Sequence, residues 1–145
     1  MSTSSSSGAT TGAATGPEHR KADVELRLPA DSAYASVLRT TTAGLAARLD
    51  FSIDDIEDLR IAVSEASAMV LPEALPGSDL ICSFYLEPGL LTVSVGVSVA
   101  AAVTVDEDSF AWQVLTTLAS SASAESDDSS FTVVLTLDPA LGSEA

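Results

Sequence analysis

The chain has 145 residues, of which 46% are hydrophobic and 19% are charged, and its formal net charge is −15. This size and composition favour one folded domain and exclude a wholly disordered chain, because enough apolar side chains are present to build a core. All six Lys and Arg residues lie in the first 60 positions, and the remaining 85 carry twelve acidic residues. This distribution argues against nucleic acids and anionic membranes as direct partners, since both require a basic surface.

Signals for export, membrane insertion and cross-linking are missing from the sequence. No apolar run reaches the length of a membrane span, and the first residues lack the basic start and apolar stretch of a signal peptide. We therefore expect a cytoplasmic protein. Cys82 is the single cysteine, which excludes an intrachain disulfide and a cysteine zinc cluster and suits a reducing compartment. The acidic surface is interpreted as a solubilising coat or as a face for a basic partner protein.

The chain is predicted to divide into a leader, one domain and a short tail. Residues 1–22 are expected to be a disordered leader, because the first sixteen positions hold only Ser, Thr, Gly and Ala after the initial Met. A single domain is expected over residues 23–138. Residues 139–145 are expected to be a frayed C-terminus.

The first half of the domain is predicted as a strand followed by two helices. Apolar and charged residues alternate from Val24 to Leu28, and Pro29 ends this strand. Asp31 or Ser32 caps a helix that extends to about residue 49. The apolar positions of this helix follow helical spacing: Tyr34, Val37, Leu38, Leu45 and Leu49. A second helix starts within residues 52–55 and ends at Pro72. Its apolar positions recur at steps of three and four: Ile56, Leu59, Val63, Ala66 and Val70.

The second half is predicted as a hairpin, a third helix and a last strand. Residues 80–86 and 91–99 alternate apolar and polar side chains, and a Pro-Gly turn joins them. Ser109 is a candidate cap for the third helix, after the acidic run 106–108. The side chains expected on the buried side of this helix are Phe110, Val114, Leu115 and Leu118. Residues 120–130 are expected to be a polar loop, and the alternation over residues 131–137 predicts the last strand.

The predicted strands decide the fold class. Every strand is half polar, whereas a sheet covered by helices on both faces needs nearly continuous apolar strands. We therefore expect an α+β fold: a two-layer sandwich with a mixed, mostly antiparallel sheet and its helices on one face. A doubly wound nucleotide-binding sheet is disfavoured, and neither GxGxxG nor a GxxxxGK run followed by Ser or Thr occurs.

One segment of the domain carries a family resemblance. Residues 49–74 have the sequence LDFSIDDIEDLRIAVSEASAMVLPEA. They resemble the second helix of the RsbW-type anti-sigma factors, and DLRIAVSEA, their most specific part, matches the run that opens the N-box of that family. The likeness extends over roughly residues 24–137, from VELRLPA to FTVVLTL. It implies the ATPase fold shared by histidine kinases and gyrase, and the activity of a small serine-protein kinase.

The resemblance also implies a nucleotide site, from which this chain departs at three places. Glu65 stands at the position of the family's general base, but Met69 stands where the family has a magnesium-binding asparagine, and a thioether is a poor ligand for that cation. Val97 stands near the position of the aspartate that reads adenine. Ser109 and Ala111 lie where the family has a glycine-rich phosphate-binding segment. We interpret the chain as a degenerate member of the family, in which neither ATP nor magnesium is expected.

The resemblance places Arg39 at the position of an arginine that contacts the sigma factor in relatives. A guanidinium presents a rigid fork of donors suited to carboxylates, although a solvated helix face explains an arginine equally well. We therefore expect a non-catalytic anti-sigma factor that sequesters an RNA polymerase sigma subunit, forms a homodimer and is countered by an anti-anti-sigma antagonist. Two alternatives stay open: an active serine-protein kinase that phosphorylates the antagonist with Mg-ATP, and an adaptor that binds only the antagonist.

Three further side chains are interpreted mainly as structural. Phe110 and Trp112 are expected in the core more often than on a contact surface. Cys82 lies on the apolar side of its strand, where a thiol is usually inert. A redox-sensing role for Cys82 is the weaker alternative.

Overall fold

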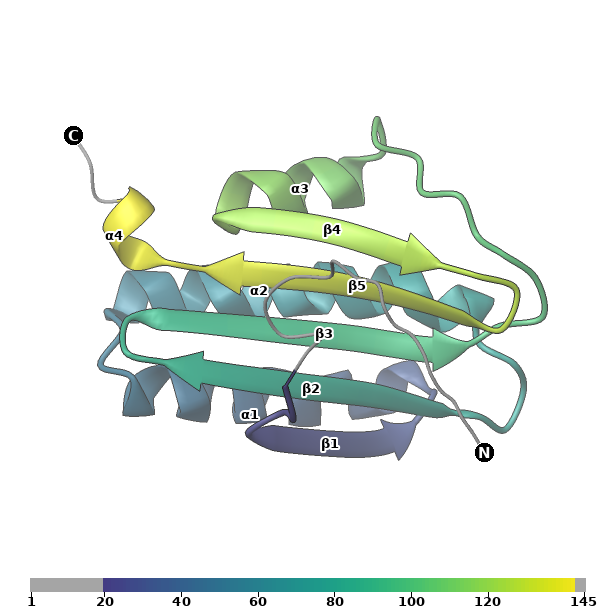
Figure 1. Cartoon of the computed structure of the whole chain (residues 1–145), viewed down its shortest axis with the longest axis horizontal. Helices are drawn as coiled ribbons and strands as arrows, with labels where there is room; N and C mark the ends of the chain where they lie inside the picture. Colours follow the sequence, from purple (N-terminus) through teal and green to yellow (C-terminus); the bar gives the residue numbers. More distant parts are fainter. Residues whose placement is uncertain (1–19, 143–145) are drawn as a thin grey trace.

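The computed structural model describes residues 20–142, so residues 1–19 of the predicted leader and residues 143–145 lie outside it. It contains a five-stranded sheet in the order β1-β2-β3-β5-β4, in which all neighbouring strands are antiparallel (Figure 1). The strands are β1 (Val24–Pro29), β2 (Asp79–Glu87), β3 (Leu90–Ser98), β4 (Ser121–Ser126) and β5 (Ser130–Leu137). The helices are α1 (Ala35–Arg48), α2 (Ile53–Val70), α3 (Phe110–Leu118) and α4 (Pro139–Gly142), with the 3-10 turns η3 (Ser32–Tyr34) and η4 (Leu71–Glu73).

The elements form two layers around one core. Helices α1 and α2 lie against one face of the sheet, and α3 packs beside α2 (Figure 1). The predicted α+β two-layer sandwich is thus confirmed, with the difference that the sheet is wholly antiparallel rather than mixed. The helix-facing side chains of the central strands are buried: Leu80, Cys82, Phe84, Leu91, Val93, Val95, Val97, Phe131, Val133, Leu135 and Leu137. The opposite face of the sheet carries the polar half of each strand.

Helix α2 forms as the sequence predicts. The Ser52 hydroxyl accepts a hydrogen bond from the backbone N–H of Asp55 (3.1 Å) and donates one to the Asp55 carboxylate (2.8 Å). The acidic residues of this first turn also interact favourably with the helix dipole. The buried positions recur at steps of three and four, namely Leu59, Ala62, Val63, Ala66, Ser67 and Val70. Pro72 falls in the short turn η4 that ends the helix.

Helix α1 buries a different stripe from the one predicted. Asp31 acts as a cap by accepting the backbone N–H of Ala33 (2.9 Å), but residues 32–34 then form the turn η3. A 3-10 turn has 3.0 residues per turn instead of 3.6, which changes the side chains that face the sheet. Tyr34 and Val37, two of the five apolar positions at helical spacing, are each 40% exposed, whereas Leu38 is completely buried. The buried stripe is Leu38, Thr42 and Ala46, in which the Thr42 hydroxyl donates to the Leu38 carbonyl (2.8 Å).

Helix α3 has the predicted cap but exposes one predicted core residue. The Ser109 hydroxyl accepts the backbone N–H of Trp112 (3.2 Å). Leu115 is buried and Trp112 is half-buried, in agreement with the helical pattern. Phe110, in contrast, is 79% exposed, so its predicted burial is wrong. Phe110 is the first residue of α3, so no earlier turn of the helix is present to cover its side chain.

The segment predicted as a polar loop contains the edge strand β4. Ser121–Ser126 pairs with β5, from Ser121 opposite Thr136 to Ser126 opposite Phe131. The sequence SASAES has no β-branched or aromatic residue, so pairing with β5 rather than intrinsic preference makes it a strand. In the connecting turn, the Asp127 carboxylate accepts the backbone N–H groups of Ser129 and Ser130, which lowers its pKa. At the other end of β5, Pro139–Gly142 forms α4 where a frayed terminus is predicted.

Cys82 lies on the inner face of β2, as its alternating position predicts, and is completely buried. Burial raises its pKa from 9.0 to about 12. The thiolate therefore forms at lower pH in the unfolded chain than in the folded one, so we expect Cys82 to leave stability unchanged below pH 9.0 and to reduce it as the pH rises towards 12. At pH 8 the smaller thiolate fraction should make the thiol react with a disulfide reagent about 1,000-fold more slowly in the native chain than in guanidinium chloride. Equal rates would contradict the burial of this side chain.

Candidate functional site

The positions implied by the family resemblance begin on one flank of α2. Glu65 and Met69 are four residues apart, so they lie on the same side of the helix, and both are half-buried. Asp58 is two turns before Glu65 on this flank and lines a hollow with Thr117 and Leu118 of α3. The flank that carries Glu65 and Met69 is therefore the one on which α3 packs.

The remaining positions lie at the same end of the helix layer. The backbone N–H of Leu75, just after α2, donates to the Ser98 carbonyl (2.9 Å), which places the end of α2 beside the end of β3. Val97, the position of the family's aspartate, is 4% exposed there and pairs with Phe131. Helix α3 runs antiparallel to α2, so its N-terminus points towards this end (Figure 1). The end of α2, the end of β3 and the N-terminus of α3, which carry the predicted positions Glu65, Met69, Val97, Ser109 and Ala111, therefore lie at the same end of the fold.

Apolar side chains occupy this end of the molecule. Met69, Val103, Val105 and Trp112 are partly buried and pack against the hydrophobic core. Magnesium requires oxygen ligands in near-octahedral geometry, whereas Met69 offers a thioether and Val97 offers no donor. Across residues 20–142, no group of three or more His, Cys, Asp or Glu side chains is placed to hold a metal ion. The residues present do not fit a magnesium–nucleotide complex.

The charges around Glu65 also differ from those of a phosphate site. No Lys or Arg follows Arg60 in the sequence, while residues 106–108 place three acids just before α3. A triphosphate needs cationic side chains or a bound metal to offset its charge. The Glu65 carboxylate itself forms no hydrogen bond or ion pair with another residue in the described part of the chain. Glu65 is therefore a half-buried acid that no cationic side chain of the described residues neutralises.

Arg39, the predicted partner-binding residue, lies on α1 at its boundary with α2. Its guanidinium donates one long hydrogen bond to the Ser64 hydroxyl (3.4 Å) and is half-buried. Arg20, Arg27 and Arg60 all form ion pairs with acidic neighbours. Arg39 forms none within residues 20–142, so most of its donors stay available to a carboxylate from outside the chain.

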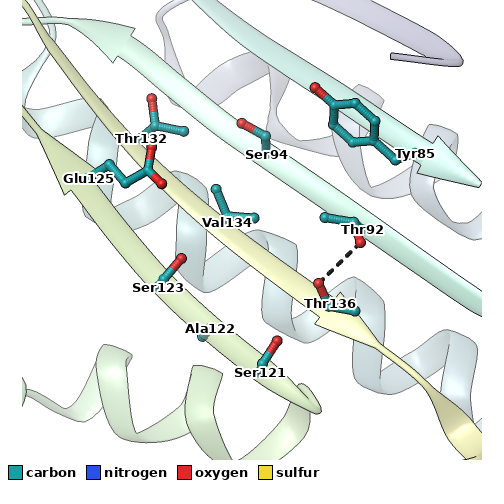
Figure 2. Close-up of a pocket in the computed structure, with 10 residues that line it drawn as sticks. All are labelled: Tyr85, Thr92, Ser94, Ser121, Ala122, Ser123, Glu125, Thr132, Val134 and Thr136. Atoms are coloured by element: carbon teal, nitrogen blue, oxygen red, sulfur yellow. Dashed lines mark hydrogen bonds between the residues drawn. The ribbon is translucent and has the colours of Figure 1, made fainter. Parts of the chain in front are cut away.

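The open face of the sheet carries a hollow that was not predicted as a site. It measures about 280 Å³, and Figure 2 shows hydroxyl side chains from several strands turned towards it. The residues that line it are Tyr85, Thr92, Ser94, Ser121, Ala122, Ser123, Glu125, Thr132, Val134 and Thr136. The Thr92 and Thr136 hydroxyls lie 3.1 Å apart and share a hydrogen bond. The alternating Ser and Thr positions of β3 and β5 are the sequence signal for this face, but the pairing with β4 is needed to complete it.

Arg20 borders this face, although it falls in the predicted leader. Its guanidinium lies 5.4 Å from the centre of the Tyr85 ring. It also forms ion pairs with Asp23 (3.3 Å) and Glu87 (3.8 Å). The folded part of the chain therefore starts before residue 23, because a cation–π contact and two acids hold Arg20 against β2.

Comparisons with known proteins add a partial relationship. No family model matches the chain. Over 51 residues, 35% of the chain, it is 43% identical to the serine-protein kinases RsbW of Bacillus thuringiensis, Bacillus cereus and Bacillus anthracis, and the match covers 32% of each of them. The chain thus matches about a third of the length of these curated relatives. In the described residues, no helix is both long and apolar enough to cross a membrane. Together with the fold, the sequence identity supports a relationship between this chain and the RsbW family.

Proposed function

We propose that the chain is an anti-sigma factor that sequesters an RNA polymerase sigma subunit by protein–protein contact, without using ATP. The relationship to the RsbW family supports this class of partner. The observation that carries the rest is the chemistry beside Glu65, where a thioether and valine side chains stand in place of oxygen ligands and cations. A scaffold of this kind acts by holding another protein.

Mg-ATP is expected to give no heat of binding to the full chain in isothermal titration calorimetry, up to millimolar nucleotide. The reason is that neither the metal nor the phosphates would meet suitable ligands around Glu65 and Met69. The RsbW kinase of Bacillus cereus, measured in the same buffer, is the positive control. Binding at micromolar strength would overturn the part of the proposal that excludes ATP.

The partner is tested with the tagged full chain as bait for purified sigma subunits from the same organism. We expect one sigma subunit to be retained at equal stoichiometry and to be released by an excess of the anti-anti-sigma antagonist. Competition of this kind would replace nucleotide control in a partner-switching system. Retention of the antagonist without any sigma subunit would instead identify an adaptor and overturn the anti-sigma proposal.

One observation favours an active kinase as the second candidate. The Glu65 carboxylate is half-buried and has no partner among the described residues, so it is available to accept a proton from a substrate hydroxyl. Incubation of the antagonist with the chain and Mg-ATP, followed by intact-mass measurement, distinguishes the two functions. A phosphoryl mass gain that Glu65→Gln removes would establish the kinase.

The proposal includes a homodimer, because the family resemblance implies one. The open face of the sheet supports it, since the hydroxyl-lined hollow bears a single charged side chain, Glu125, among its ten lining residues. Two copies meeting there would bring few like charges together. Sedimentation velocity of the full chain measures the oligomeric state directly.

A further inference from the structure

Helix α3 presents an uncovered apolar ridge to solvent. Phe110, Val114 and Leu118 recur at steps of four, so they follow one side of the helix over about 12 Å. Phe110 is 79% exposed, and the three side chains line a shallow hollow of about 270 Å³ together with Gln113 and Thr117. An exposed aromatic side chain at the end of an apolar ridge is a typical anchor point for another protein.

The ridge runs into a second hollow that is acidic. This hollow, of about 520 Å³, shares Thr117 and Leu118 with the first one, so the two are continuous. Asp55 and Asp58 of α2 line it on one side and Asp138 on the other. Leu141 of α4, which is 65% exposed, extends the apolar surface beyond it.

The three carboxylates of the acidic hollow have no cation of their own. None of Asp55, Asp58 and Asp138 forms an ion pair within residues 20–142. Desolvation by burial raises the pKa of Asp58, and the negative charges of Asp55 and Asp54 raise it further. A cationic side chain placed in this hollow would relieve that repulsion.

The charge and shape of the ridge and the acidic hollow together indicate which kind of partner can bind there. A second copy that met this surface about a two-fold axis through the acidic hollow would place Asp55, Asp58 and Asp138 opposite the same acids, which is unfavourable. An anionic membrane or a nucleic acid would meet the same repulsion. A basic amphipathic helix fits both parts, because its apolar side chains can cover the ridge while Lys or Arg side chains reach the acids.

We propose that a basic amphipathic helix of a partner protein docks on this surface. The docking surface consists of the apolar ridge of Phe110, Val114 and Leu118 and the acidic hollow of Asp55, Asp58 and Asp138. It lies on the opposite flank of α2 from Ser64, which accepts the hydrogen bond of Arg39 from α1. The docking surface therefore stands on its own geometry and does not depend on the anti-sigma proposal.

The test uses a capped 14-residue peptide of Leu and Lys with its Leu residues at helical spacing. Binding to the full chain is followed by calorimetry and by the fluorescence of Trp112, the single tryptophan, which belongs to α3. We expect 1:1 binding that Phe110→Gln weakens at least tenfold. The double variant Asp55→Asn with Asp58→Asn should weaken binding by a similar factor and reduce its dependence on salt.

Matched controls separate this surface from general attraction to an acidic chain. Ile61→Gln removes another exposed apolar side chain (45% exposed) and Asp128→Asn another exposed acid, and both should bind within twofold of the unaltered chain. Thermal unfolding checks that each variant folds. Equal binding by Phe110→Gln and Ile61→Gln would overturn the proposal, as would equal affinity for a peptide with Glu in place of Lys. Self-association that Phe110→Gln abolishes would assign the surface to a second copy and also overturn it.

Discussion

Arg39→Glu is expected to abolish co-purification of the sigma subunit while leaving the thermal unfolding midpoint unchanged. Arg39 has one long hydrogen bond, to Ser64, and no acidic partner in the described part of the chain. Its guanidinium can therefore form paired hydrogen bonds with carboxylates of a partner, and charge reversal replaces them with repulsion in a chain of net charge −15. Interface arginines of this kind are worth about 2–4 kcal/mol, which corresponds to a loss of affinity of about 30- to 1,000-fold.

The control for this variant is Arg48→Glu. Arg48 belongs to the same helix, is exposed, and likewise forms no ion pair within residues 20–142. It changes the net charge by the same amount, so it measures the effect of charge alone, which should be less than fivefold in affinity, as is typical for a rim residue. Equal retention of the sigma subunit by both variants would remove Arg39 from the binding surface.

Phe84→Ala is expected to lower the free energy of unfolding by about 3–5 kcal/mol, as removal of a buried Phe typically does. Phe84 is completely buried on the helix-facing side of β2, between Val24 of β1 and Val93 of β3. Its loss leaves a cavity at the centre of the core that three paired strands cannot close by local movement. Urea denaturation followed by circular dichroism measures the change.

The neighbouring Tyr85→Ala is the control for this core variant. Tyr85 points to the open face, where it is partly exposed, so its removal should cost about 1 kcal/mol through lost contact area and the lost Arg20 stacking. If Phe84→Ala lowered the free energy of unfolding by less than Tyr85→Ala does, the position of Phe84 in the core would be contradicted. Because domains of this size are stable by only about 5–15 kcal/mol, Phe84→Ala should also lower the yield of folded protein at 37 °C.

The elements that the sequence predicts best are those in which local signals agree. In α2, the Ser52 cap, the acidic first turn and the regular apolar spacing all indicate the same helix. The hairpin of β2 and β3 likewise follows from alternation and from the Pro88-Gly89 turn, in which Gly89 supplies a φ of 73°. These elements need no information from distant parts of the chain.

The elements that the sequence misses depend on tertiary contacts. The segment SASAES becomes β4 by pairing with β5, and its only local signal is the alternation of Ser with Ala122 and Ala124, which pack against the core. Helical spacing places Phe110 on the same stripe as Val114 and Leu118, but cannot tell that this stripe borders solvent. Tyr34 in the 3-10 turn and Val37 in α1 are likewise 40% exposed, because tertiary packing decides which apolar positions of this segment face the sheet.

The candidate site was only partly accessible from the sequence. A helical step of four already places Glu65 and Met69 on one flank. That Val97, Ser109 and Ala111 lie at the same end follows from the antiparallel course of α3 and from the contact between Leu75 and Ser98, which link distant segments. The apolar side chains Val103 and Val105 were outside every sequence motif, yet they help to cover this end.

The two edge strands have a consequence for behaviour at high concentration. An uncovered sheet edge invites strands of other molecules, which leads to fibrous polymers. Edge strand β1 carries Glu25 and Arg27 and ends at Pro29, and the pairing of Arg27 with Asp79 at 2.9 Å fastens it to β2. Edge strand β4 is six residues long and includes Glu125. Charged side chains and short length at both edges, together with Pro29 on β1, therefore protect the chain against cross-β assembly.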